Sequence, residues 1–129
     1  MSHDLNALSP AVRGFLAERH LATLTTLRAD GSPHVVAVGF SYDSDARLVR
    51  VITFAGSVKA ANARRGGRAA ACQIDGRRWL TLEGIVSITD ETDRVAAAVA
   101  GYAARYRQPG ERADRVAIEI AIDKIIGNA

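Results

Sequence analysis

The sequence predicts a mainly β fold, an antiparallel barrel of six strands accompanied by three helices. Short apolar segments rich in Val, Ile, Leu and Thr recur along the 129 residues, as the strands of a small barrel do. Asp30-Gly31 and Asp75-Gly76 separate neighbouring segments with hairpin chemistry. Most connections are too short for crossovers, which favours antiparallel pairing. Because the apolar runs are more continuous than alternating, they favour closure into a barrel.

The first half of the chain begins with a helix and continues with three strands. Ser9 is suited to cap the helix and Pro10 to occupy its first position. The helix is expected to end near Arg19-His20. The strands are expected at residues 21–28, 33–42 and 48–54, the second of them nearly continuous in apolar residues.

The second half begins with a short helix at residues 58–65, which Ser57 is suited to cap and Gly66-Gly67 to end. A third helix is expected at residues 91–107, capped by Asp90 and closed by Pro109-Gly110. The remaining strands are expected at residues 69–74, 79–89 and 116–126, the last with an alternating pattern.

Composition limits the class of protein. Hydrophobic residues make up 48% of the chain, which predicts one globular domain over residues 1–129. No apolar run is long enough to span a membrane, and the N-terminus lacks a signal pattern, so we expect a cytoplasmic protein. A net charge of +3 with no basic block argues against nucleic-acid binding. The single cysteine, Cys72, can form no internal disulfide.

The strand-to-helix turn around Ser57 is the strongest functional signal. A strand that ends at a capped helix start presents free N–H groups and the positive end of a helix dipole, which suits an anion such as phosphate. The alternative is an ordinary capped surface helix with exposed basic residues. The side chains expected to add donors around the turn are Arg50, Thr53, Ser57, Lys59 and Asn62.

A second signal is the single tryptophan, Trp79, which follows Arg77 and Arg78 at a hairpin. A flat apolar ring beside guanidinium groups suits a planar, acidic ligand. A core tryptophan beside exposed arginines is an equally good interpretation. Arg64, near the turn, extends the positive surface and could guide an anionic tail.

No metal site and no nucleophilic triad can be assembled from the sequence. The three histidines, His3, His20 and His34, share no spacing that places two on one helix face. His34 opens an apolar strand, where a structural, hydrogen-bonded role is favoured over a catalytic one. The common nucleotide-binding fingerprints are absent.

Several segments resemble the pyridoxamine-5′-phosphate-oxidase-like split β-barrel family. Residues 21–36 are similar to its first hairpin, and Ser57-x-Lys59-x-x-Asn62 looks like its cofactor-phosphate motif. Within this family, residues 73–84 resemble the branch that uses coenzyme F420, and most closely its biliverdin reductases. The resemblance covers roughly residues 9 to 127.

The resemblance implies an FMN-binding-protein-like homodimer with a cofactor between the two barrels. It implies that Arg50, Thr53, Ser57, Lys59 and Asn62 hold the phosphate and that the partner chain supplies the region around Arg78. The cofactor-binding residues expected on this basis are His34, Val36, Val38, Arg50, Ile52, Thr53, Ser57, Lys59, Asn62, Arg64, Arg78, Trp79 and Leu80.

The resemblance also implies a reaction, hydride transfer from reduced F420 to a conjugated small molecule. Biliverdin, a linear tetrapyrrole reduced to bilirubin, is the expected acceptor, and its two propionates suit nearby arginines. His34 and Arg78 are the candidate catalytic residues. Two alternatives remain open: an FMN-dependent enzyme similar to pyridoxamine-phosphate oxidase, and a non-catalytic F420-binding or carrier protein.

Overall fold

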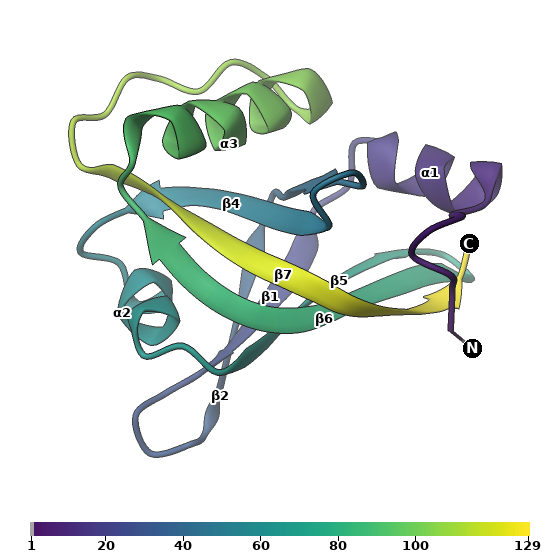
Figure 1. Cartoon of the computed structure of the whole chain (residues 1–129), viewed down its shortest axis with the longest axis horizontal. Helices are drawn as coiled ribbons and strands as arrows, with labels where there is room; N and C mark the ends of the chain where they lie inside the picture. Colours follow the sequence, from purple (N-terminus) through teal and green to yellow (C-terminus); the bar gives the residue numbers. More distant parts are fainter. Residues whose placement is uncertain (1) are drawn as a thin grey trace.

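The protein is an antiparallel sheet of seven strands with three helices, described by a computed structural model for residues 2–129. Figure 1 shows the sheet curling around an interior, with α3 above it, α2 at the end where β4 finishes and α1 at the other end. The helices are α1 (Pro10–Ala17), α2 (Val58–Arg64) and α3 (Thr92–Arg105). The strands are β1 (Ala22–Leu27), β2 (Pro33–Val38), β3 (Ser41–Asp43), β4 (Leu48–Phe54), β5 (Arg68–Asp75), β6 (Arg78–Thr89) and β7 (Arg115–Asn128).

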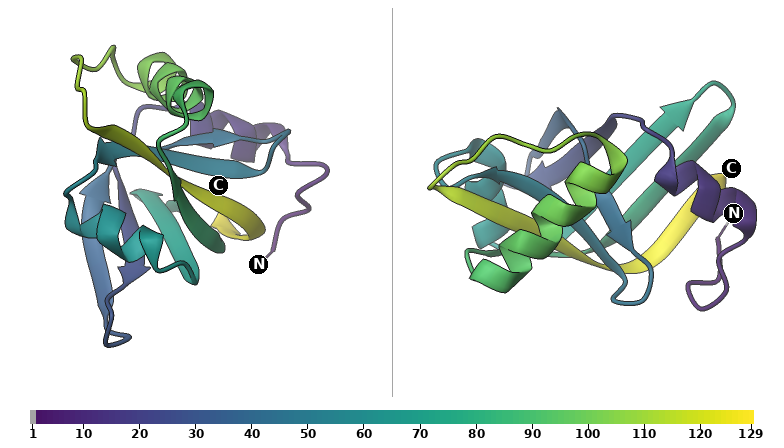
Figure 2. Two further views of the ribbon diagram at one scale, coloured as in Figure 1. Left: turned by 60° about the vertical axis from the view of Figure 1, so that its left-hand side comes forward. Right: turned by 90° about the horizontal axis from the view of Figure 1, so that it is seen from above.

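The strands pair in the order β2-β1-β5-β6-β7-β4-β3, and every pairing is antiparallel. The antiparallel prediction is therefore confirmed. β2 and β3 form the two edges of the sheet, and within residues 2–129 no ladder joins them. The sheet is thus curled but split, as the two views in Figure 2 show.

The prediction of six strands was wrong, because the segment expected as one strand at residues 33–42 forms both β2 and β3. The break lies at Gly39-Phe40, where side chains at the C-terminal end of α3 form hydrogen bonds with the backbone groups that a ladder would use. Phe40 N–H donates to the Tyr106 hydroxyl at 3.3 Å, and Arg105 Nη1 donates to the Phe40 carbonyl at 2.8 Å. A Cβ added to Gly39 would lie 3.0 Å from the Tyr102 and Tyr106 rings, so α3 packs directly on this bend.

The other predicted strands are confirmed to within two residues at each end. The third helix is shorter than predicted, because it begins after Glu91 rather than Asp90 and has no side-chain cap. It ends at Arg105, and Pro109 disfavours helical backbone in the residue before it. The predicted Ser9 cap of α1 is confirmed by the bond from Val12 N to Ser9 Oγ at 3.2 Å.

The core lies inside the curl of the sheet and is closed by α1 at one end. Its largest fully buried apolar side chains include Phe15 from α1, Leu24 from β1, Leu82 from β6 and Ile118 from β7. Each such side chain stabilises the fold by roughly 1.5–3 kcal/mol through burial. Only two of the largest fully buried side chains among residues 2–129, Phe15 and Phe40, are aromatic.

Glycine allows β6 and β7 to approach at a bulge. The register of these strands shifts between Glu83 and Gly84. A Cβ on Gly84 would lie 1.9 Å from the Ala121 carbonyl oxygen, closer than any side chain can be accommodated without moving the backbone.

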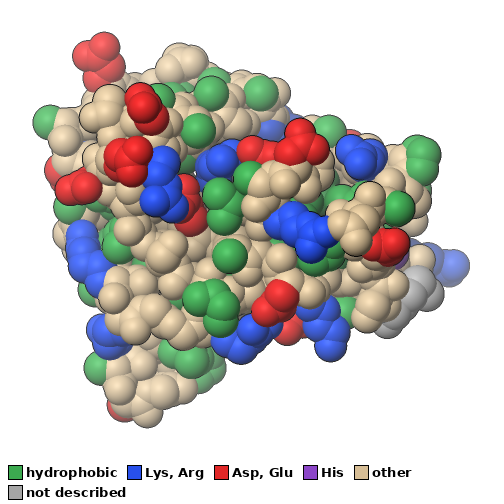
Figure 3. Space-filling view, in the orientation of Figure 1, with side chains coloured by type: hydrophobic (Ala, Val, Ile, Leu, Met, Phe, Trp, Pro, Cys, Tyr) green, Lys and Arg blue, Asp and Glu red, His purple; other side chains and the backbone are tan. Residues whose placement is uncertain are grey.

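Charge is distributed without one dominant patch on the face in Figure 3, where acidic and basic side chains are interspersed. None of the helices in residues 2–129 is long and apolar enough to cross a membrane.

Candidate functional site

A cavity of about 330 Å³ lies at the split in the sheet, between the end of β2 and the exposed edge of β4. β3 pairs with β4 only as far as Arg50, so residues 51–54 have no partner strand on that side. α2, α3 and the segment between α3 and β7 complete the wall. The lining residues are Ala37, Val38, Gly39, Val51, Ile52, Thr53, Phe54, Lys59, Tyr102, Arg107, Pro109, Gly110, Arg112 and Arg115.

Unpaired backbone groups face this cavity from both strand edges. Ala55 N–H donates to Asp114 O across the β4–β7 ladder. Because backbone groups alternate sides along a strand, those of Ile52 must point to the open edge. In the β1–β2 hairpin, Arg28 N–H donates to the Ser32 carbonyl, so the backbone groups of Ser32 face β1. By the same alternation along the strand, the backbone groups of Ala37 point to the free edge of β2. A planar heterocycle with donors and acceptors on its rim suits such edges, since buried backbone groups need partners.

The strand-to-helix turn lies beside the cavity and has the predicted cap. Ser57 Oγ accepts from Ala60 N–H at 3.1 Å and from Thr53 Oγ1 at 2.9 Å. The first two amides of α2, at Val58 and Lys59, have no backbone or side-chain acceptor within residues 2–129. Lys59 is half-buried in the cavity wall. The turn therefore offers an anion two N–H donors and an ammonium group.

Three of the predicted cofactor-binding residues already have polar partners within the chain. Asn62 is only 3% exposed, and its amide donates to Thr26 Oγ1 at 3.0 Å. Arg50 is half-buried and pairs with Asp43 at 3.1 Å. The side chain of Arg64 donates to the Ala55 carbonyl at 2.9 Å. None of the three predicted ligands lines the cavity.

The predicted cofactor-binding residues of β2, namely His34, Val36 and Val38, share one face of that strand, but only Val38 lines the cavity. Val36 packs against the core. His34 lies near the hairpin end of β2 opposite Thr26, and its Nδ1 is buried without a hydrogen-bond partner in residues 2–129. Of the predicted residues on β4, Ile52 and Thr53 do line the cavity.

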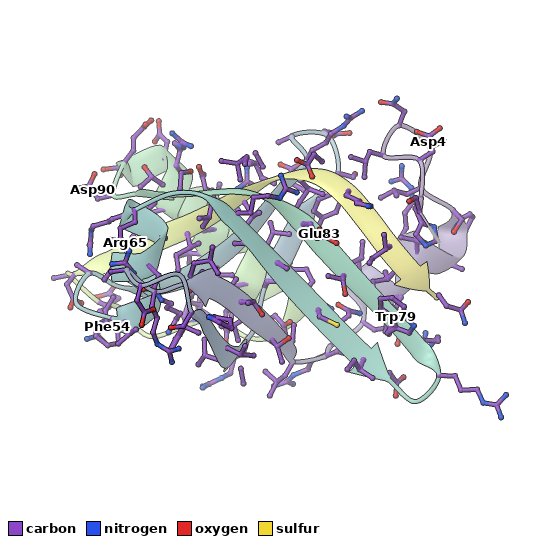
Figure 4. The ribbon with its side chains drawn as sticks, turned by 90° about the horizontal axis from the view of Figure 1, so that it is seen from below. Asp4, Phe54, Arg65, Trp79, Glu83 and Asp90 are labelled. Atoms are coloured by element: carbon purple, nitrogen blue, oxygen red, sulfur yellow. The ribbon has the colours of Figure 1, made fainter. Side chains whose placement is uncertain are left out.

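The predicted Arg78–Leu80 segment lies at the end of the molecule opposite the cavity. Figure 4 shows Trp79 far from Phe54 and Arg65, which lie at the end occupied by α2. The side chain of Leu80 is fully buried, whereas Trp79 is 38% exposed on the outer face of the sheet. One chain thus cannot bring this segment to its own cavity.

Arg78 is held among carboxylates. Its guanidinium donates to Glu18 at 2.8 and 2.9 Å and to Asp75 at 2.5 Å, and it stacks over the Phe15 ring at 4.4 Å. The bonds from Arg78, and then from His20, lower the pKa of Glu18 to about 2. The same carboxylates raise the pKa of Arg78, so this side chain can act as a fixed positive charge but not as a proton donor.

A group with metal-ligand atoms occurs at this same place. Ligand atoms of Glu18, His20 and Asp75 lie within 4.8 Å of one another. The guanidinium of Arg78 already pairs with both carboxylates, which explains their proximity without an ion.

Sequence reasoning missed the arginines that follow α3. Arg107, Arg112 and Arg115 all line the cavity beside Lys59. Arg112 lies over the Phe54 ring at 4.3 Å and pairs with Asp114 at 2.5 Å. The available signal was the recurrence of arginine around Pro109-Gly110, once before this pair and twice between it and the apolar part of the last strand. Only the fold brings that segment against β4.

Comparison with known proteins agrees with this geometry. Residues 8–128 match the family described as Pyridoxamine 5′-phosphate oxidase. A protein of Mycobacterium tuberculosis (strain CDC 1551 / Oshkosh), named F420H(2)-dependent biliverdin reductase, is 50% identical over 129 residues, which covers 100% of this chain and 94% of that protein.

Solved structures show the same fold. A conserved hypothetical protein from Mycobacterium tuberculosis has a TM-score of 0.78 and 25% identity, over 94% of this chain and 84% of its own. A structure described as an F420 reductase has a TM-score of 0.71 and 26% identity, over 88% of this chain and 94% of its own. The resemblance inferred from the Ser57-x-Lys59-x-x-Asn62 motif is confirmed: the chain belongs to the pyridoxamine 5′-phosphate oxidase family.

Proposed function

We propose that this chain is a reductase that uses reduced coenzyme F420 to transfer a hydride to biliverdin, giving bilirubin. The observation that carries the proposal is the 50% identity, over the whole chain, to a protein named F420H(2)-dependent biliverdin reductase. The likeness to an F420 reductase structure at 26% identity points to the same cofactor.

The cavity fits a phosphorylated planar cofactor. Its volume of about 330 Å³ falls within the range of roughly 300–1,000 Å³ that small-molecule sites occupy. The Lys59 ammonium and the free amides at the start of α2 would hold the phosphate. The open edges of β2 and β4, at Ala37 and Ile52, would orient the ring.

The reaction adds a hydride and a proton to the conjugated acceptor, while the cofactor loses two electrons. When bound, reduced F420 supplies the hydride, so the task of the protein is positioning and charge stabilisation. Tyr102 and the segment after α3 form one wall of the cavity against which the bound molecules would be positioned. Arg78 serves as a fixed charge in this proposal, and His34 stays the candidate for proton transfer.

We also propose that the chain acts as a homodimer through the outer face of its sheet. Val35, Ile74, Trp79 and Ile85 are 38–64% exposed, and the strand registers place all four on this face. An exposed apolar surface of this kind is typical of an interface. A second copy would bring its Arg78–Leu80 segment, which one chain holds remote from its own cavity, within reach of the partner's cavity.

We further propose that residues 1–129 act as one cofactor-binding domain. One continuous cluster of buried side chains extends from Leu8, before α1, to Ile125 in β7, which supports this view.

Anaerobic mixing of enzyme, reduced F420 and biliverdin tests the reaction. The absorbance of oxidised deazaflavin should rise as that of biliverdin falls, with bilirubin formed in proportion. Reoxidation by menadione but not by biliverdin would exclude the acceptor. No reoxidation by any acceptor would indicate a carrier protein. Parallel titrations with F420 and FMN complete the test, because tighter binding of FMN would contradict the proposed cofactor.

A further inference from the structure

The segment that joins α3 to β7 brings a second group of cations to the cavity. We define the arginine trio as Arg107, Arg112 and Arg115, the last being the first residue of β7. All three line the cavity together with Lys59. Arg112 and Arg115 also line a larger hollow of about 780 Å³ between α3 and the same segment. Arg112 and Arg115 therefore lie where the two hollows meet.

The trio has more positive charge than its surroundings neutralise. Arg112 pairs with Asp114 at 2.5 Å, and this pairing, with a smaller effect of Arg115, lowers the pKa of Asp114. No carboxylate oxygen of residues 2–129 lies within 4.0 Å of the side-chain nitrogens of Arg107 or Arg115. Two guanidinium groups in one wall are thus free to bind an anion.

Two members of the trio, Arg112 and Arg115, are also held in position by the fold. Arg115 is the antiparallel partner of Phe54 in the β4–β7 ladder. The guanidinium of Arg112 lies 4.3 Å from the centre of the Phe54 ring, a stacking arrangement that limits its rotamers. Phe54 itself lines the cavity, so the cations flank an aromatic surface that a conjugated ligand could cover.

One phosphate does not account for this charge. The turn at Lys59 offers a phosphate an ammonium group and two amides, as described above. The planar fork of an arginine matches a carboxylate in two parallel hydrogen bonds. We propose that the arginine trio is a second anion subsite that binds a carboxylate of the bound molecules, separate from the phosphate subsite at Lys59.

This inference rests on the proposed function and allows two sources of the carboxylate. One is a propionate of the linear tetrapyrrole, and the other is a carboxylate of the cofactor side chain. Both require the same chemistry from the protein. The two sources predict that different ligands lose affinity for the protein when the trio is altered.

The test uses the double variant Arg107→Gln/Arg115→Gln, which removes the two arginines without a carboxylate partner and keeps the Arg112–Asp114 pair. The matched control is Arg13→Gln, an exposed arginine of α1 that does not line the cavity. Calorimetric titrations measure the affinity of the full-length protein for biliverdin, biliverdin dimethyl ester, F420, and F420 trimmed of its glutamyl carboxylates. Circular dichroism and thermal melting establish that the variants are folded.

We expect about tenfold weaker binding by the double variant of whichever ligand supplies the carboxylate, with a smaller dependence on salt. A loss for biliverdin but not for its dimethyl ester would assign the subsite to the acceptor. A loss for F420 but not for trimmed F420 would assign it to the cofactor. Equal affinities of the double variant, the control and the wild type for all four ligands would overturn the proposal. Because these are binding measurements, they remain decisive even if the wild-type protein fails to reduce biliverdin, which would refute the proposed function alone.

Discussion

Replacing Lys59 with alanine separates binding of the cofactor from stability of the fold. Lys59 is half-buried in the cavity wall, and no carboxylate oxygen of residues 2–129 lies within 4.0 Å of its ammonium group. Its removal therefore leaves no buried charge without a partner. Alanine also favours a helix more than lysine does. We expect the free energy of unfolding to change by less than about 0.5 kcal/mol.

Binding should respond much more strongly than stability. A charge-assisted hydrogen bond to the phosphate contributes about 1.5–3 kcal/mol, so the dissociation constant for F420 should rise about ten- to a hundredfold. Lys59→Arg should lose less, because it keeps the positive charge but changes its geometry.

Fluorescence titration of oxidised F420 measures the effect. Lys124→Ala is the matched control, since it removes the only other lysine of the sequence, an exposed one on β7 outside the cavity. An affinity of Lys59→Ala within twofold of the control would refute the reasoning, because the phosphate would then bind elsewhere. A large fall in melting temperature would refute the claim that Lys59 has no structural role.

Three further predictions concern assembly and stability. Analytical ultracentrifugation at micromolar concentration should show a dimer of the 13.7 kDa chain, and a stable monomer would contradict the proposed interface. Gly84→Ala should destabilise the protein by about 1–3 kcal/mol or more in urea unfolding, because its Cβ would meet the Ala121 carbonyl at 1.9 Å. The control Gly14→Ala adds a Cβ in open space on α1 and should be neutral or stabilising by up to about 1 kcal/mol. The folded-state pKa of Glu18 is lowered from 4.5 to about 2, so the stabilisation that this carboxylate contributes should be complete above pH 4.5 and be lost as the pH falls toward 2. The melting temperature of Glu18→Gln should therefore vary less with pH across this window than that of the wild type. An unchanged pH profile would show that the pairing with Arg78 does not stabilise the fold.

The local signals in the sequence predicted most elements correctly. The cap at Ser57 depends on residues within four positions of it, namely Thr53 and Ala60, and so it could be read from a short segment. The same holds for the Asp-Gly hairpins and for the position of Lys59 beside the turn. The family was also recognisable from the motif that this turn contains.

Side-chain partners distant in the sequence decided which predicted ligands remained free. Asn62 pairs with Thr26, 36 positions away, and Arg78 pairs with Glu18, 60 positions away. Nothing near either residue in the sequence indicates these bonds. The sequence thus showed which side chains at a predicted site are polar. It did not show whether such a side chain is available to a ligand or is bonded to another part of the protein.

Short segments of the sequence were enough to indicate the family, the antiparallel strands and the capped strand-to-helix turn at Ser57, because each depends on neighbouring residues or on a contiguous motif. The place where the sheet splits, and the cations that face the resulting cavity, depend on contacts between distant parts of the chain. The bend at Phe40 exists because Arg105 and Tyr106, at least 65 positions away, bind its backbone groups. The arginines after α3 reach the cavity because β7 pairs with β4 and carries that segment past Phe54. Contacts of this kind depend on how the whole chain folds back on itself, and no local pattern encodes them.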